Sequence, residues 1–347
     1  MLAKIEIISP GIQCSIQDNG RYGGLDYGVS QSGVMDVFAY DYANSIVGNL
    51  SGTPALEILG GSFKALVLEP AVICVSGAIT EMKINSVQAR LWESYLLNRG
   101  DQIELKSCQS GIRNYMAIQG TWCGIDKFLD SYSTDEKAKI GGLSGRALKR
   151  GDVLSAIWTK GAVKRNLTTY VDPYFKQLTS KVKEVRVLLG PQEDAFTSIG
   201  IDTFFNCEYE MTTTSNRMGL RLKGQAVEHI ESPDILSDAI PFGAIQIPGD
   251  GQPIIMMADR QTTGGYTKIG TVVSTDLPVL AQARPGDFIR FIRIGQQELE
   301  IIDQERACRQ NLIRQKKEET EIISSKQFMV NVKNQHYELL VEELESV

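Results

Sequence analysis

The sequence has little histidine and no paired cysteines, and both scarcities argue against common kinds of catalytic site. Only His229 and His336 occur among the 347 residues, far apart and outside any motif. The six cysteines are scattered without a Cys-x-x-Cys pair, which is typical of small buried residues rather than of disulfides or zinc ligands. We therefore expect no Ser–His–Asp or Cys–His arrangement and no metal centre. Any chemistry must use carboxylates, Lys, Arg, amides, hydroxyls or backbone groups.

Long apolar runs and an excess of positive charge are also missing. No apolar run approaches the ~20 residues that a membrane helix needs, and the first residues lack the charged and apolar regions of a signal peptide. The formal net charge is −6 and the pI is near 5.2. This balance argues against nucleic acid or an anionic membrane as the main partner. We therefore expect a cytoplasmic protein.

What is present is an ordinary globular composition with a strand-rich pattern. Hydrophobic residues make up 42% and charged residues 22% of the chain, and its length suggests two or three domains of ~150 residues. Apolar and polar residues alternate in many short runs, and helices are too few for a doubly wound fold. A polar stretch near residues 162–182 predicts a boundary. The predicted units are residues 1–165, 183–294 and 295–347.

Short helices are predicted where a capping residue precedes an apolar pattern. Asp36 is a candidate cap for a helix over 37–47, and Asp276 for one reaching about residue 283. A further helix is expected over about 192–205. Beyond residue 295, a charge-rich helix to about residue 321 with few core positions precedes an alternating hairpin over 327–344.

A Gly-Asp pair precedes a strand-like run at three places. The tripeptides are Arg99-Gly100-Asp101, Arg150-Gly151-Asp152 and Pro285-Gly286-Asp287. A turn that feeds a strand three times indicates barrel-like domains of duplicated design.

The strongest site candidate is the polar stretch 259–268, Asp-Arg-Gln-Thr-Thr-Gly-Gly-Tyr-Thr-Lys, between two apolar runs. Adjacent glycines allow positive φ angles and close approach of a ligand to the backbone. Guanidinium, ammonium, amide and hydroxyl groups beside them suit a carboxylate, phosphate or carbamoyl-like group. A polar turn without a ligand is the alternative. The predicted catalytic residues are Asp259, Arg260 and Lys268, and the predicted substrate-binding residues here are Gln261, Thr262, Thr263, Gly264, Gly265 and Tyr266.

Two further polar clusters are candidates for substrate binding. One is the Gly-rich loop after residue 15, with Gln17, Asp18 and Arg21, and the other contains Ser215 and Arg217. Arginine suits bidentate binding of a carboxylate or phosphate, and lysine a point-charge contact. The acid–base candidates, each of which could equally be a cap or a salt-bridge partner, are Asp18, Asp36, Glu57 and Asp259.

Several motifs in one order resemble a known family. The anchors are residues 15–21, 28–36, 56–58, 189–192, 215–222, 243–248, 258–266, 276–278 and 284–287. They are similar to the biotin-dependent carboxyltransferase subunit family, which includes allophanate hydrolase subunit 2 and the C subunit of 5-oxoprolinase. The resemblance covers most of the chain and implies two tandem cyclophilin-like β-barrel domains, with a few short helices and a C-terminal helix plus β-hairpin.

The resemblance also implies activity and partners. Family members act with, or are fused to, a subunit-1-type protein. Such pairs, with a third 5-oxoprolinase component, take part in ATP-dependent cleavage of 5-oxoproline to glutamate. ATP, with or without Mg²⁺, is thus expected from the resemblance alone, because the sequence has no Walker-type loop. Two alternatives are a carboxyltransferase subunit of a urea carboxylase-like enzyme and a non-catalytic regulator that antagonises a histidine-kinase inhibitor.

The terminal hairpin resembles the first hairpin of a biotinyl carrier domain. No Ala-Met-Lys-Met tetrapeptide follows it, so no biotin is expected on this chain. A hairpin that docks on the barrel or on the partner is the simpler interpretation.

Overall fold

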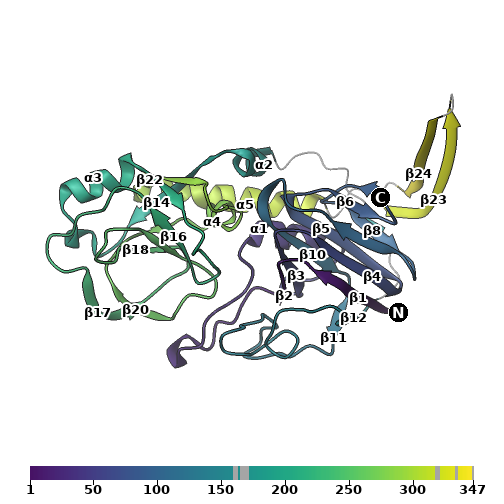
Figure 1. Ribbon diagram of the computed structural model, residues 1–347, viewed down its shortest axis with the longest axis horizontal. Coiled ribbons are helices and arrows are strands. Elements are labelled where there is room, and N and C mark those ends of the chain that lie inside the picture. Colours follow the sequence, from purple (N-terminus) through teal and green to yellow (C-terminus); the bar gives the residue numbers. More distant parts are fainter. Residues whose placement is uncertain (159–162, 165–171, 317–320, 333–334, 346–347) are drawn as a thin grey trace.

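The computed structural model describes residues 1–158, 163–164, 172–316, 321–332 and 335–345. Strands dominate and form a domain of two sheets, a closed barrel and a terminal hairpin (Figure 1). The mainly β prediction is confirmed. None of the helices in these ranges is both long and apolar enough to cross a membrane.

The first domain is built from two largely antiparallel sheets that share one core. The seven-stranded sheet has the order β11 (Thr121–Cys123), β12 (Val153–Ile157), β1 (Leu2–Pro10), β4 (Phe63–Glu69), β9 (Gln102–Leu105), β6 (Met82–Ile84) and β7 (Val87–Ala89). The five-stranded sheet has the order β2 (Gln13–Gln17), β3 (Ala55–Leu59), β10 (Ser110–Ile118), β5 (Ala71–Ile79) and β8 (Ser94–Leu97).

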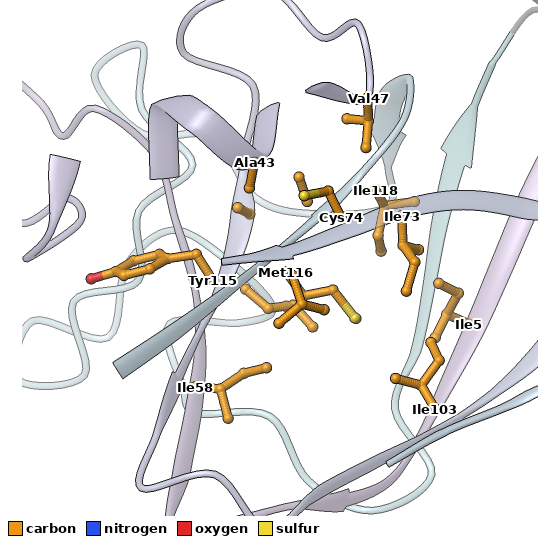
Figure 2. Close-up of a cluster of buried hydrophobic side chains, with 14 of the residues drawn as sticks. Ile5, Ala43, Val47, Ile58, Ile73, Cys74, Ile103, Tyr115, Met116 and Ile118 are labelled. Atoms are coloured by element: carbon orange, nitrogen blue, oxygen red, sulfur yellow. The ribbon is translucent and has the colours of Figure 1, made fainter. Parts of the chain in front are cut away.

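Aliphatic side chains from both sheets and from α1 (Val37–Ile46) fill this core. Ile5 and Ile103 come from the larger sheet, Ile58 and Met116 from the smaller one, and Ala43 from the helix (Figure 2). All are essentially inaccessible to solvent. Each buried Ile contributes about 1.5–3 kcal/mol relative to an exposed one, so this core holds the sheets together and fixes the loops at their edges.

The Gly-Asp turns are built alike, as the sequence repeat predicts. Gly100, Gly151 and Gly286 have φ angles of 96°, 88° and 86°, which favour glycine. The carboxylates of Asp101, Asp152 and Asp287 each accept a hydrogen bond from the backbone N–H three residues earlier, at 2.6, 2.8 and 2.9 Å. Strands β9, β12 and β22 (Phe288–Ile294) begin directly after these turns.

The second domain is a closed barrel. Its strand order is β14 (Val182–Leu189), β21 (Lys268–Val272), β18 (Ala244–Gln246), β19 (Ile254–Met256), β16 (Gly219–Lys223), β15 (Glu208–Met211) and β22. The parallel pairing of β14 with β22, from Val182↔Phe288 to Leu188↔Ile294, closes it. Alternate residues such as Val185, Val187 and Phe291 point into its core.

The two domains are joined by buried polar contacts. Gln282 follows α4 (Leu277–Ala281) of the barrel. Its amide donates to the Asp36 carboxylate at 2.8 Å and accepts from the backbone N–H of Arg113 at 2.9 Å. Asp36 also accepts from Ala39 N at 3.0 Å, which confirms it as the cap of α1. Met35 packs into the barrel core. The relative placement of the domains is therefore fixed by side chains from both.

Helix α5 (Leu299–Lys316) is charge-rich with few core positions, as predicted, and it contacts both domains. Ile302 is buried, and Glu305 forms an ion pair with Arg186 of the barrel at 2.7 Å. Arg309 stacks over the Phe38 ring of the first domain, 5.8 Å from its centroid. The helix thus ties both domains together. A short 3₁₀ turn, η3 (Gln296–Glu298), leads into it.

The hairpin projects from the molecule (Figure 1). It consists of β23 (Glu321–Val332) and β24 (Gln335–Glu345), longer than the predicted 327–344, and β13 (Val163–Lys164) pairs with β23. The hairpin turn is predicted at residues 334–335. Asn334 lies outside the described residues, and Gln335 begins β24. Helix α2 (Asp172–Thr179) follows β13, and its Tyr174 and Leu178 pack in the first domain's core.

Two helix predictions differ in detail. The helix expected over 192–205 is split into a 3₁₀ turn, η2 (Glu193–Ala195), and α3 (Ser198–Asn206), because Thr197 caps the second piece through a bond from Gly200 N. Asp276 precedes α4 but makes no cap bond. Its carboxylate accepts two hydrogen bonds from the Arg186 guanidinium instead. An ion pair that is distant in sequence thus replaced the local cap.

Candidate functional site

The polar stretch 259–268 is not a continuous loop. It starts as a turn, in which Asp259 N donates to Arg217 O at 2.9 Å. Thr263–Tyr266 then form β20, which pairs antiparallel with β17 (Asp234–Ala239) as a two-stranded ribbon separate from the barrel sheet. In Figure 1 this ribbon lies at one end of the barrel, below β18. The ribbon places predicted site residues over the barrel's end.

The expected positive φ angles at the two glycines are wrong. Neither Gly264 nor Gly265 is among the positive-φ residues of the chain, because both lie in an extended strand. Gly264 is required for space instead. A Cβ at this position would lie 2.6 Å from Ile240 Cδ1 and 2.7 Å from Gln246 Nε2. At Gly265 the nearest atom would be 3.4 Å away, which is ordinary contact.

Arg217 joins the two domains through two carboxylates. Its Nε and Nη2 donate to the two oxygens of Asp259, both at 2.8 Å, and its Nη1 donates to Glu57 on β3 at 2.5 Å. Glu57 also accepts from Tyr115 OH at 2.8 Å, and Arg113 lies 3.6 Å away. Two of the predicted site residues are thus committed to each other in an interdomain ion network.

The charges of this network stabilise one another despite burial. Burial alone would raise the pKa of the Glu57 carboxyl, but Arg217 and Arg113 together with hydrogen bonds hold it below its usual value. Burial would lower the pKa of Arg217, and Asp259 and Glu57 raise it above its usual range. Both groups therefore remain charged at neutral pH, which does not suit Glu57 as an acid–base group.

Arg260 is a different kind of arginine. Only 5% exposed, it donates from Nε to Ile240 O at 2.8 Å and from Nη2 to Gln31 Oε1 of the first domain at 3.0 Å. Its guanidinium lies over the Phe242 ring, 5.5 Å from the centroid. No ion pair among the described residues includes it. Burial lowers the pKa of Arg260 to about 10, against a small opposing effect of Tyr22. An unneutralised buried cation of this kind suits an anionic ligand.

Lys268 is also buried, with an exposed partner. Its Nζ lies 2.9 Å from Asp238 Oδ2 of β17, and the two side chains are 8% and 53% exposed. The hydrogen bond from Lys268 lowers the pKa of the Asp238 carboxyl. Lys268 N donates to Gln192 Oε1 at 2.9 Å. This cation is therefore held by a carboxylate that solvent reaches.

The predicted Gln17–Asp18–Arg21 cluster is buried at the edge of the first domain. Asp18 accepts hydrogen bonds from Ser131 Oγ and Ser133 Oγ, both at 2.6 Å, and from two backbone N–H groups. Its acceptor sites are thus used within the loop, so Asp18 has a structural role. Gln17 donates to Thr134 O at 3.1 Å.

Arg21 connects this cluster with the barrel's polar stretch. Its Nη2 donates to Ser133 O, whereas its Nε and Nη1 are buried without a hydrogen-bond partner. Burial lowers the pKa of Arg21, and the charges of Asp135, Asp18 and Asp259 oppose this. Arg260 Nη2 donates to Gln31 Oε1 in the segment that follows Arg21, at 3.0 Å. The N-terminal loop region and the 259–268 stretch therefore meet at the domain interface, although the sequence suggested two separate pockets.

The remaining predicted residues lie on the periphery. Ser215 Oγ accepts from Arg221 N at 3.0 Å and shapes the turn before β16. The side chains of Gln261 and Thr263 are exposed and that of Thr262 is partly exposed. Tyr266 lines a surface hollow of about 590 Å³, whose other polar lining residues are Thr212, Thr214, Arg221, Lys223, Asp250 and Gln252.

Sequence reasoning missed Asp238, Gln31 and Gln246 as members of the site. Gln246 had a signal: it is an amide inside the otherwise apolar run 244–247, and it is 2% exposed. Its Nε2 is buried without a hydrogen-bond partner. Asp238 and Gln31 lie in ordinary polar segments, and only the fold brings them to Lys268 and Arg260.

A β fold whose two halves meet at a buried ion network defines the class of this chain. It belongs to the carboxyltransferase domain family, subdomains A and B, which residues 27–293 match. Among curated proteins it is similar to the 5-oxoprolinase C subunits of Haemophilus influenzae, with 33% identity, and of Escherichia coli, with 35% identity. In both cases the match covers 85% of this chain and 92% of the relative.

Among solved structures the chain is similar to the Kluyveromyces lactis urea amidolyase. The TM-score is 0.80 at 30% identity, over 90% of this chain but only 20% of that protein. The likeness therefore concerns one part of a much longer chain, whereas the two curated relatives correspond over nearly their whole length.

Proposed function

We propose that this chain is a subunit of an ATP-dependent 5-oxoprolinase that cleaves 5-oxoproline to glutamate together with a subunit-1-type partner, with a third component as a further expectation. The observation that carries the proposal is the match to the two 5-oxoprolinase C subunits over 92% of their length. The fold places one set of donors at the domain interface and the other under the β17–β20 ribbon. This is consistent with a subunit that contributes a binding surface.

The chemistry of the buried cations supports this substrate class. 5-Oxoproline carries a carboxylate and a lactam, so its site needs a cation for the first and N–H donors for the oxygen of the second. Arg260 and Lys268 are buried cations, and Gln246 and Gln261 are amides near Gly264. In our proposal the two cations bind and orient the anionic substrate, and the Gln261 amide holds the lactam oxygen.

Asp259 receives a different role from the catalytic one that its sequence position suggested. Both of its oxygens are bound by the Arg217 guanidinium at 2.8 Å. Because both oxygens are used in this pair, the carboxylate is not free to contact a substrate. We assign Asp259 and Arg217 to positioning: they fix the turn that carries Arg260 against the first domain.

ATP would supply the activation of the lactam oxygen, but the described residues do not form a recognisable nucleotide site. No three His, Cys, Asp or Glu side chains in this part of the chain come together to hold a cation such as Mg²⁺. The hollow beside Tyr266 contains Arg221 and Lys223 but no Gly-rich phosphate cradle. We propose that the partner provides the nucleotide site and that this chain alone does not turn over 5-oxoproline.

A urea carboxylase-like carboxyltransferase is the second candidate, favoured by the TM-score of 0.80 to the urea amidolyase. The two differ in substrate charge, because urea is neutral and needs no buried cation. The test is reconstitution of the chain with a subunit-1-type protein and ATP. Glutamate formation from 5-oxoproline, and none by the isolated chain, is the expected result. Carboxylation of urea with a biotinyl carrier, without 5-oxoproline cleavage, would favour the second candidate.

A further inference from the structure

The β17–β20 ribbon lies over the end of the barrel like a flap. It pairs with no barrel strand among the described residues. Two backbone bonds extend the ribbon's own ladder at its ends, Ile240 N to Thr262 O at 3.0 Å and Thr267 N to Pro233 O at 2.9 Å. β17 is exposed along most of its length, and Leu236 is 94% exposed. Few contacts therefore hold this segment.

Two facing residue pairs meet beneath the ribbon. Asp238 and Gly264 face each other across the ribbon, and Gln246 and Lys268 face each other across β18 and β21 of the barrel. Lys268 Nζ reaches Asp238 at 2.9 Å. Gln246 Nε2 reaches Gly264, since a Cβ there would lie 2.7 Å from it. The ribbon pair, Asp238 and Gly264, thus covers the barrel pair, Gln246 and Lys268. A side chain at position 264 would prevent this close packing.

The barrel pair is incompletely satisfied in this arrangement. Gln246 is 2% exposed and its Nε2 has no hydrogen-bond partner, and a buried donor without a partner is destabilising. The Lys268 ammonium is buried, yet its carboxylate partner is half exposed. The Asp238 carboxylate of the ribbon accepts from Lys268 Nζ at 2.9 Å and from Gln192 Nε2 at 3.4 Å. Gln246 Nε2 lies without a partner beside Gly264, the residue that faces Asp238 across the ribbon.

We propose that Lys268 and Gln246 form a binding site for the carboxylate of a small ligand, and that the Asp238 carboxylate occupies this site until the ligand displaces it. The proposal deepens the proposed function, because 5-oxoproline is such a carboxylate. Displacement frees β17, whose side-chain ion pair with the barrel is that of Asp238. One ammonium and neutral amides suit a monoanion rather than a phosphate, which usually meets several cations.

The test compares wild type with Asp238→Asn, Lys268→Met and Asp234→Asn. Asp234 lies on the same exposed strand and no ion pair of the described residues includes it, so its change is the matched control. Binding of 5-oxoproline, of glutarate and of the neutral primary amide of 5-oxoproline is measured by calorimetry. Asp238→Asn removes the internal competitor and should tighten carboxylate binding about tenfold, the usual effect of one charge-assisted hydrogen bond. Lys268→Met should weaken it by a similar factor.

Two further measurements distinguish displacement of the Asp238 carboxylate from a general effect of the substitution on the protein. The neutral amide should bind wild type and Asp238→Asn equally. The amides of Ile240 and Thr267 should exchange their hydrogens faster in Asp238→Asn, because the flap has lost its ion pair. Carboxylate binding that is no tighter in Asp238→Asn than in wild type, or equally tightened in Asp234→Asn, would overturn the site.

Failure of the site and failure of the proposed function look different. Cleavage of 5-oxoproline by the reconstituted enzyme with an unchanged KM in Asp238→Asn would refute the site and leave the function. Glutarate binding that depends on Lys268 and tightens in Asp238→Asn, without turnover of 5-oxoproline, would leave the site and refute the function.

Discussion

The 259–268 stretch contributes Asp259 to the ion network of Arg217 and also carries the cations Arg260 and Lys268, and these charges differ in how they are neutralised. Arg217 is bound by two carboxylates, one from each domain. Arg260 has hydrogen bonds but no ion pair among the described residues, and Lys268 has one exposed partner. The difference separates charges that are neutralised across the domain interface from charges that are not, and the second group contains the two cations that we propose for ligand binding.

Removing Arg217 should have the largest effect on stability. Arg217→Met leaves Glu57 and Asp259 without their main cation. Breaking a buried pair in this way costs about 3–5 kcal/mol, measured by urea unfolding. Arg221→Met is the control, because Arg221 is exposed, close by and part of no described ion pair, and such changes usually stay within about 0.5 kcal/mol. An equal midpoint for the two variants would show that the network does not hold the domains.

The same network should make the free energy of unfolding depend on pH in the acid range. The folded pKa of Glu57 is lowered, so its contribution is present above the unfolded pKa of about 4.3. It is lost as the pH falls through the folded pKa. Glu57→Gln should therefore flatten the dependence of unfolding free energy on pH below about 5. If the unfolding free energy of Glu57→Gln depends on pH as steeply as that of wild type, other carboxylates cause the acid sensitivity.

Arg260→Lys tests the role of the buried arginine that has no ion pair among the described residues. Lysine keeps the charge but loses the planar fork that reaches Ile240 and Gln31 and that would bind the proposed anionic ligand. Loss of one charge-assisted hydrogen bond costs about 1.5–3 kcal/mol, or roughly a ten- to hundredfold loss of rate in the partner-reconstituted enzyme. Melting temperature is measured on the same preparations. A wild-type rate, or a loss explained by unfolded protein, would remove Arg260 from the site.

The two adjacent glycines should differ. Gly264→Ala places a Cβ 2.6 Å from Ile240 Cδ1 and 2.7 Å from Gln246 Nε2. Overpacking of this kind typically costs about 1–3 kcal/mol. Gly265→Ala meets nothing closer than 3.4 Å, so its effect should be below about 0.5 kcal/mol. Urea unfolding of both variants checks this. Equal losses would mean that β20 does not lie against Gln246.

Features set by local chemistry were predictable from the sequence. The Gly-Asp turns at Gly100, Gly151 and Gly286 follow from glycine's freedom at positive φ and from a carboxylate that binds a nearby N–H. The cap at Asp36 follows from similar chemistry. The strand-rich class followed from alternation, and the family from its ordered motifs.

Choices between distant partners were not predictable. Arg217 pairs with Glu57, which lies 160 residues earlier in the chain. Asp276 accepts from Arg186 instead of capping its own helix. Lys268 pairs with Asp238, an unremarkable residue of a polar segment. The Gly264-Gly265 pair indicated positive φ angles and close approach of a ligand to the backbone, but the fold uses Gly264 for close packing in a strand. Local patterns report which groups are polar, and the three-dimensional fold decides which of them meet.

The smallest effect is expected at the C-terminal end. Within the described residues, β23 and β24 pair with each other and with β13, and with no strand of either domain. Deletion of residues 321–347 should therefore leave the cooperative melting transition within a few degrees of wild type. Deletion from residue 299 onward also removes buried Ile302 and the Glu305–Arg186 pair of α5. Loss of one buried aliphatic side chain alone costs about 2–5 kcal/mol, so this variant should melt at a clearly lower temperature. Equal melting of the two truncations would show that α5 does not join the domains, and loss of the transition in the shorter deletion would make the hairpin part of the folded core.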